Sequence, residues 1–271
     1  MGTYVLTEKI QIHENRIDLG EKGGMLFEIE MVYRHSCKEY CLTLYNNEST
    51  PANSVHLKLI EYGDYDLDGL TKLQRRILDR RMKALQDHFD SIAAAMQTGD
   101  MESLKNTTNI DSFVNWYLLN ELTRNYDSAF VTSCYCFFDE SGRLYMGPVW
   151  DFDTCYGIQD PAHDTQHIQD APWFNWLMNN CPEFVDMVKA RWTELRNDGT
   201  INDFVNAIDD IDEHIKESEI LQHSLYPDSE LKNVPYDEAV QYFKHWLSKR
   251  LVWMDQNFLI GYEEASSSNR K

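Results

Sequence analysis

Acidic residues stand at two separated points in the middle of this chain. The first is Asp127, which ends the segment 120–127, and the second is Asp151 with Asp153, in the segment 147–153. Enzymes that transfer a phosphoryl group use one carboxylate near the attacking hydroxyl and another on Mg²⁺. The pattern therefore predicts metal-assisted phosphoryl transfer, provided that the fold brings the two points together.

A predicted β-hairpin separates the two acidic points. Residues 129–138 are rich in aromatic and β-branched side chains, residues 139–142 form an Asp-Glu-Ser-Gly turn, and residues 143–146 form a second short strand. A hairpin returns the chain to where it started. We therefore expect Asp127 and Asp151 to meet at one end of it.

A simpler interpretation of these acids must be weighed. A carboxylate after a helix is often only a cap or a solvated charge. Asp151 and Asp153, however, flank Phe152, and the preceding residues 146–150 look buried. Because buried acids need partners or metals, a functional role is the sharper hypothesis for this pair.

The remaining pattern predicts an α+β fold. Strand-like alternation covers residues 4–12, 25–33, 40–45 and 56–59. Helical spacing begins at residue 70, where Leu73, Ile77, Met82, Leu85 and Phe89 recur, and returns at residues 112–122, 182–196, 201–219 and 236–258. The tryptophans at 173, 176, 192, 246 and 253 are expected to pack between helices rather than to stack on ligands.

Length and composition indicate one compact domain. The chain has 271 residues, of which 42% are hydrophobic and 13% aromatic, so it can bury a substantial core. No apolar run is long enough to span a bilayer, and the first residues lack a signal-peptide pattern. The net charge of −20 makes nucleic acid a poor partner. The same charge makes Mg²⁺ important for any bound triphosphate, because the metal neutralises the phosphates. A simpler explanation of the acidity is that it only keeps the protein soluble.

The six cysteines do not predict a zinc site. Cys37 and Cys41 are four apart and Cys134 and Cys136 two apart, and no pair of histidines completes either set. Cys134 and Cys136 would point to the same side of a strand, too far apart for an easy disulfide. Buried, unpaired thiols are expected.

Two further patterns offer weaker alternatives. Residues 64–69 open like a calcium loop, but Arg75 stands where the bidentate acid belongs, which favours a turn before a helix. His163 and His167 could bind a transition metal if they were helical, whereas Pro161 and the polar neighbours favour a loop. Residues 160–172 follow Asp151 and either gate substrate access or form an ordinary surface loop.

Across nearly its whole length the chain resembles the CotH (spore-coat protein H) kinases, an atypical branch of the protein-kinase-like fold. The resemblance runs through YVLTEKI (4–10), NRID (15–18), GGMLFEIE (23–30), IDSF (110–113), NELTRNYD (120–127), GPVWDFD (147–153), PEF (182–184), RWTELR (191–196) and WLSKRLVWMD (246–255).

The resemblance implies roles for individual residues. Asp127 falls on the catalytic-loop aspartate, Asp151 on the metal-binding aspartate, and Asp153 on a second position for metal binding, with Asn125 as a supporting ligand. It implies ATP and Mg²⁺ as cofactors, and Ser or Thr of a protein as the phosphoryl acceptor. Glu8 and Glu28, or Glu30, would contact the nucleotide site by pairing with a basic phosphate-binding group.

The resemblance also implies a domain plan. Residues 1–271 would form a single domain with the remnant of a β-rich small lobe at 1–62. A mainly helical large lobe at 63–271 would contain the catalytic hairpin at 120–157. An extracytoplasmic, cell-surface or spore-associated setting would suit the family, but the residues select no compartment.

Departures from the family pattern keep other functions open. Family members have further sequence before residue 4, including a basic residue for the phosphates, so that lysine is expected to be missing here. Phe138 stands where relatives carry Lys, and Cys134, Cys136 and Cys155 replace commoner residues. The main alternative is a non-catalytic pseudokinase or interaction module of the same fold. A carbohydrate-processing enzyme with two carboxylates is a third class.

Overall fold

The structure, a computed structural model, describes residues 6–7, 9–19, 24–31, 40–46, 48–49, 54–62, 67–225 and 234–262. Its strands are β1 (Met25–Met31), β2 (Cys41–Tyr45), β3 (Val55–Tyr62), β4 (Cys134–Phe138) and β5 (Leu144–Met146). Its α-helices are α1 (Lys72–Thr98), α2 (Met101–Thr107), α3 (Ile110–Thr123), α4 (Pro172–Asn180), α5 (Pro182–Asn197), α6 (Thr200–Leu225) and α7 (Tyr236–Phe258), with short 3₁₀ helices η2 (Tyr126–Ser128) and η3 (Ile168–Asp170). The α+β prediction is confirmed.

The five strands form one antiparallel sheet in the order β2-β3-β1-β4-β5. The predicted hairpin is confirmed as β4-β5, and β4 also pairs with β1, so that Glu28 lies opposite Tyr135. The strands predicted for the small lobe and the hairpin predicted for the large lobe therefore share one sheet. The division into lobes at residue 62 stays a prediction.

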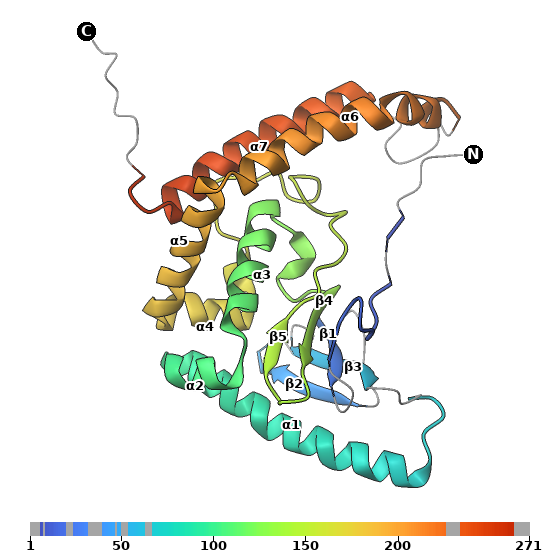
Figure 1. Cartoon of the computed structure of the whole chain (residues 1–271), viewed down its shortest axis with the longest axis vertical. Coiled ribbons are helices and arrows are strands. Elements are labelled where there is room, and N and C mark those ends of the chain that lie inside the picture. Colours follow the sequence, from blue (N-terminus) through green and yellow to red (C-terminus); the bar gives the residue numbers. More distant parts are fainter. Residues whose placement is uncertain are drawn as a thin grey trace.

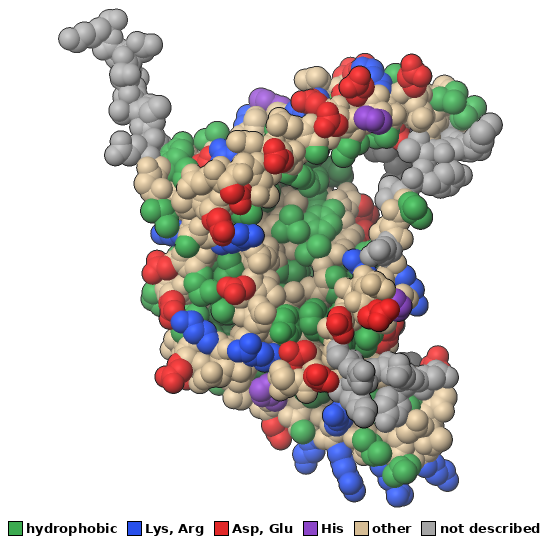
Figure 2. Space-filling view, in the orientation of Figure 1, with side chains coloured by type: hydrophobic (Ala, Val, Ile, Leu, Met, Phe, Trp, Pro, Cys, Tyr) green, Lys and Arg blue, Asp and Glu red, His purple; other side chains and the backbone are tan. Residues whose placement is uncertain are grey.

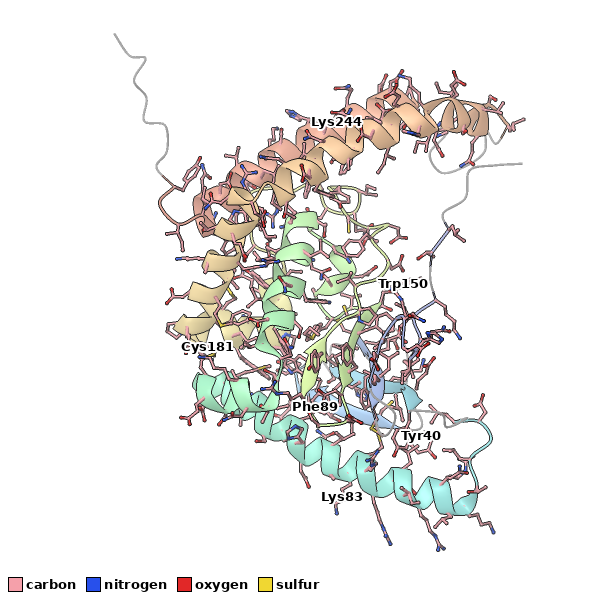
Figure 3. The ribbon with its side chains drawn as sticks, in the orientation of Figure 1. Tyr40, Lys83, Phe89, Trp150, Cys181 and Lys244 are labelled. Carbon is pink, nitrogen blue, oxygen red and sulfur yellow. The ribbon has the colours of Figure 1, made fainter. Side chains whose placement is uncertain are left out.

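The two faces of the sheet have different neighbours. Phe27 and Phe138 lie on the face that packs against α1, where their ring centroids lie 6.2 Å and 5.0 Å from that of Phe89 in edge-to-face contacts. Figure 3 shows Phe89 pointing from α1 into this interior. On the opposite face, Leu26 packs with Ile10 and other apolar residues of the segment 9–19. Glu28 and Tyr135 share that second face because side chains alternate along a strand.

Two predicted strands differ from the structure. In the described part of residues 4–12 there is no strand, only an isolated bridge from Ile12 to Ile17, because the segment crosses the sheet face instead of joining an edge. The strand predicted at residues 129–138 begins only at Cys134. Phe130 and Ser133 adopt the left-handed conformation, with φ of 65° and 55°, which is incompatible with a strand.

The helices surround α3 and extend to both ends of the molecule. Figure 1 shows α1 along the lower edge and the paired helices α6 and α7 along the upper edge. Aromatic stacking joins α3 to α4 through Trp116 and Phe174, whose ring centroids lie 5.0 Å apart. Trp173, Trp192 and Trp246 are buried, which confirms that they pack between helices. Of the described residues, no helix is long and apolar enough to cross a membrane.

Helix α1 turns only part of the predicted apolar stripe toward the core, since Met82, Leu85 and Phe89 pack there and the first two members do not. Leu78, Met82 and Phe89 are buried, whereas Leu73 and Ile77 are 67% and 41% exposed. Thr71 and Gln74 form a capping box at its start, which agrees with the predicted turn before a helix. Most of the calcium-like pattern at residues 64–69 lies outside the described residues.

The cysteine prediction is confirmed in part. Cys134, Cys136, Cys155 and Cys181 are free and buried. Cys41 is disulfide-bonded, to a partner outside the described residues, which corrects the expectation of thiols throughout.

Candidate functional site

Asp127 lies just after the C-terminus of α3. The helix ends because Arg124 is left-handed, with φ of 49°, and its backbone N–H donates to the Glu121 carbonyl at 3.2 Å. The next residues form η2, in which the Asn125 side chain accepts a hydrogen bond from the Asp127 backbone N–H at 3.3 Å. Asp127 is thus held in a capped turn and is buried.

Asn125 joins this turn to the second acidic segment. Its side-chain oxygen accepts from the Thr154 hydroxyl at 3.2 Å, and its amide donates to the Asp151 carbonyl at 3.4 Å and to Asn120 Oδ1 at 3.3 Å. Both polar atoms of the amide therefore contact protein groups. These contacts support a positioning role for Asn125, whereas its predicted role as a ligand stays a prediction.

The segment that carries Asp151 and Asp153 turns away from the sheet. Asp151 is left-handed, with φ of 59°, and its carboxylate accepts from the Ser133 hydroxyl at 3.2 Å. The Tyr156 backbone N–H donates to the Thr123 carbonyl at 2.9 Å, which anchors the segment on α3. Asp151 and Asp153 are exposed, so the expectation that they lie in a buried segment is wrong.

All three carboxylates act on one buried thiol, that of Cys155. Burial raises the pKa of Cys155 to about 12, a hydrogen bond with Thr123 opposes the rise, and the negative charges of Asp153, Asp127 and Asp151 add to it. Charges influence a buried group only when they lie near it. The Asn125 side chain also contacts the backbone of both Asp127 and Asp151, so the predicted meeting of the two acidic points is found in the fold.

The donor set suits Mg²⁺ bound together with a phosphate better than a cation held by protein alone. Among the described residues, no cluster of three or more His, Cys, Asp and Glu side chains is arranged to hold a metal. Mg²⁺ commonly uses one or two carboxylates and fills its remaining positions with water and phosphate oxygens. The exposed carboxylates of Asp151 and Asp153 fit that requirement.

Glu28 lies near this site on the second face of the sheet. It stands between Lys58 on β3 and Tyr135 on β4, with 3.9 Å from Lys58 Nζ to Glu28 Oε2. Burial, and then the charge of Glu30, raise the pKa of Glu28 to about 7, against the opposing effect of Lys58. Burial and the charges of Glu28, Glu30 and Asp151 also raise the pKa of Tyr135. Glu8 lies outside the described residues.

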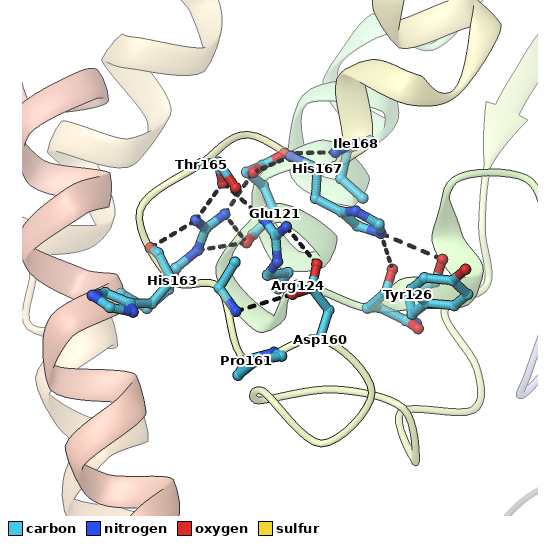
Figure 4. Close-up of polar contacts among 12 residues, drawn as sticks. Glu121, Arg124, Tyr126, Asp160, Pro161, His163, Thr165, His167 and Ile168 are labelled. Atoms are coloured by element: carbon cyan, nitrogen blue, oxygen red, sulfur yellow. Dashed lines mark hydrogen bonds and ion pairs between the residues drawn. The ribbon is translucent and has the colours of Figure 1, made fainter.

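A buried network of ion pairs and hydrogen bonds lies beside the turn that carries Asp127 (Figure 4). Glu121 on α3 and Arg250 on α7 are both 0% exposed and form an ion pair at 2.5 Å. Arg250 also donates to the Thr165 carbonyl at 2.8 Å. The Glu121 carboxylate accepts from the backbone N–H groups of His167 and Ile168, each at 2.9 Å. The network joins α3, α7 and the loop that follows the second acidic segment.

The loop that contains His167 also contacts the turn that carries Asp127. The His167 ring approaches the carbonyl of Asn125 at 3.0 Å, and Arg124 pairs with Asp160 at 2.7 Å. Figure 4 shows the His163 ring directed away from His167, so the two do not form the alternative metal pair. The loop predicted around the two histidines is confirmed, although η3 and the first residue of α4 lie within the segment 160–172, whose gating role stays a prediction.

Sequence reasoning missed Lys58, Glu121 and Arg250. The last two had a recognisable signal. Glu121 continues the buried stripe of Phe113 and Tyr117 at a spacing of four residues, and Arg250 occupies a helix face that is otherwise apolar. Lys58 had none, because its neighbour Glu28 is set by strand pairing.

Comparison with known proteins gives one match. A sequence model of the CotH kinase protein family matches residues 1–254. Neither the curated proteins nor the solved structures contain a match to the chain. Because the matched residues span most of its length and include both acidic points, the chain belongs to the CotH kinase protein family.

Proposed function

We propose that this protein transfers the γ-phosphoryl group of ATP, in the presence of Mg²⁺, to a Ser or Thr hydroxyl of a protein substrate. The observation that carries the proposal is that one side chain, Asn125, contacts the backbone of both Asp127 and Asp151, at 3.3 Å and 3.4 Å, and so brings the two acidic segments together. Asn125 links the two segments through its side chain. Membership of a kinase family supports the same reading.

Asp127 is proposed to act on the acceptor hydroxyl. Its backbone is fixed by the Asn125 cap, and the His167 ring fixes the neighbouring carbonyl. Fixed geometry is what a group that orients a hydroxyl and accepts its proton requires. The oxygen of that hydroxyl would bond to phosphorus while the ADP oxygen leaves.

Asp151 and Asp153 are proposed to hold the metal. When bound, Mg²⁺ neutralises the charge that develops on the phosphate oxygens. The hydrogen bond from Ser133 fixes one oxygen of Asp151, and its other oxygen is available to a cation. A chain with a net charge of −20 repels a bare triphosphate, so nucleotide binding should depend on the metal.

Lys58 is proposed as the basic group that contacts the phosphates. It lies beside Glu28, on the sheet face that also carries Tyr135. Tyr135 is close enough to Asp151 for the two to interact electrostatically. Glu28 would orient the ammonium group, which gives the predicted nucleotide-site role of Glu28 a physical basis.

The test is transfer of radiolabelled γ-phosphate to a Ser- and Thr-containing protein, with Mg²⁺ and with a chelator. The wild type should label the acceptor only with Mg²⁺. Lys58→Met should weaken nucleotide binding, whereas the exposed Lys249→Met should not. Mg²⁺-dependent ATP binding with no transfer to any acceptor would contradict the kinase and favour a pseudokinase.

A further inference from the structure

A row of cations lies on the outward face of α1. Lys72, Arg76, Arg80 and Lys83 are all exposed, and helical spacing places them on one side, opposite the buried Leu78. Figure 3 shows Lys83 pointing away from the body of the protein. Among the described residues, none forms an ion pair or a hydrogen bond with these four side chains.

Two aliphatic side chains accompany the cations. Leu73 and Ile77 are 67% and 41% exposed and lie one helical turn apart at the edge of the same face. Arg75 and Arg81 are engaged differently, since they approach the hydroxyls of Tyr40 and Tyr62. The outward face of α1 therefore combines a row of cations with an adjacent pair of exposed apolar side chains.

The charge of α1 contrasts with that of the chain. Residues 72–87 carry six Lys and Arg against Asp79 and Asp87, whereas α6 carries seven carboxylates and one lysine. Figure 2 shows the cations projecting from the lower edge and acidic side chains along the upper edge, so the two charged regions lie at opposite ends. Coulomb repulsion from the acidic end is screened beyond about 10 Å at moderate salt.

We propose that the outward face of α1 binds an anionic lipid surface. A single projecting helix meets a broad, flat layer along its whole length, whereas a peptide is usually held in a groove. Lys and Arg place their charged groups near lipid phosphates while Leu73 and Ile77 enter the interfacial layer. The opposite charge of the far end would orient the protein with α1 against the lipid.

The test is flotation of the full chain with vesicles of neutral lipid alone and with about 30% anionic lipid. We expect binding only to the anionic vesicles, with most of it lost between about 0.1 M and 0.5 M salt. Arg76→Glu/Arg80→Glu should weaken binding about 30-fold or more, since each cation near an anionic surface contributes about fivefold.

A matched control separates this face from general charge. Lys189→Glu/Lys249→Glu makes the same charge change on α5 and α7 and should leave vesicle binding unchanged. All these side chains are at least partly exposed, and circular dichroism verifies folding. No binding to anionic vesicles, or an equal loss in the control, would overturn the proposal. Binding to polyglutamate but not to vesicles would overturn it in favour of an acidic protein partner.

Discussion

Two charged regions near the C-terminus of α3 differ in their exposure to solvent. In the segment 147–153, Asp151 and Asp153 are exposed. Between α3 and α7, Glu121 and Arg250 are wholly buried, and hydrogen bonds with backbone groups surround them. One region leaves its carboxylates available to a ligand, and the other uses its charges internally.

The contrast teaches which residues should act on function and which on stability. A buried ion pair gains little net stability because desolvation offsets the attraction, but loss of one partner leaves an unpaired buried charge. A buried ion pair therefore acts mainly by holding the elements that carry it in one arrangement. Exposed carboxylates pack against little, so their replacement should change ligand binding and leave the folded state intact.

The largest expected effect is on catalysis by Asp127. Asp127→Asn keeps the shape and removes the proton acceptor, so phosphoryl transfer should fall about 10²- to 10⁴-fold. Nucleotide binding and the melting temperature should change little. Parallel measurement of labelled transfer and thermal unfolding checks this, and a fully active variant would remove Asp127 from the mechanism.

The largest expected effect on stability belongs to Arg250. Arg250→Met leaves the Glu121 carboxylate buried without its cation, which should lower the free energy of unfolding by about 3–5 kcal/mol. The adjacent, exposed Lys249→Met is the matched control and should stay within about 0.5 kcal/mol. Urea denaturation measures both, and equal stabilities would break the comparison between the two regions.

A smaller effect should appear in nucleotide binding by the exposed carboxylates. The wild type should bind ATP with a Kd of about 0.1–1 mM in the presence of Mg²⁺. Asp151→Asn should weaken this binding at least about 10-fold with no change in folding, because the cation loses a charged ligand. Calorimetry with and without Mg²⁺ tests it against the exposed control Asp186→Asn, and unchanged affinity in the Asp151 variant would exclude the assignment.

The smallest effect concerns pH. The pKa of Glu28 rises from 4.5 in the unfolded chain to about 7 in the folded protein, so the folded state binds the proton more tightly. This contribution to stability is present below pH 4.5 and is lost as pH rises through 7. Glu28→Gln should therefore stabilise the protein at pH 8 relative to pH 5, by about 1 kcal/mol after allowance for solvent screening.

The control for the pH effect is an exposed glutamate on the hairpin turn. Glu140→Gln should show no comparable difference between pH 8 and pH 5. Denaturant unfolding of both variants at the two pH values gives the comparison. A stability gain for Glu28→Gln that is the same at both values would show that Glu28 ionises normally in the folded protein.

Local patterns in the sequence predicted the elements better than their pairing. The hairpin at Asp139–Gly142 and the helices around Trp116 and Trp192 follow from turn residues and periodicity, which are local properties. The neighbours of Glu28 could not be predicted, because Lys58 and Tyr135 reach it only through strand register. Long-range pairing leaves no mark in a single sequence.

The sequence predicted which acidic residues form the site better than it predicted their exposure to solvent. The convergence of Asp127 with Asp151 and Asp153 was expected from the hairpin, and their common effect on Cys155 agrees with it. Their exposure was not expected, because the apolar residues before Asp151 suggested burial. Asp151 itself is left-handed, and a non-glycine residue in that conformation is uncommon enough that it could not be predicted from the sequence.

The central claim, that Asp127 and Asp151 belong to one phosphoryl-transfer site, is tested most directly by a double-mutant cycle. Transfer rates are measured for the wild type, Asp127→Asn, Asp151→Asn and the double variant, all verified as folded. If the two carboxylates act as a unit, the double variant should be about as slow as the slower single variant. Losses that multiply across the cycle would show independent roles and would contradict the account.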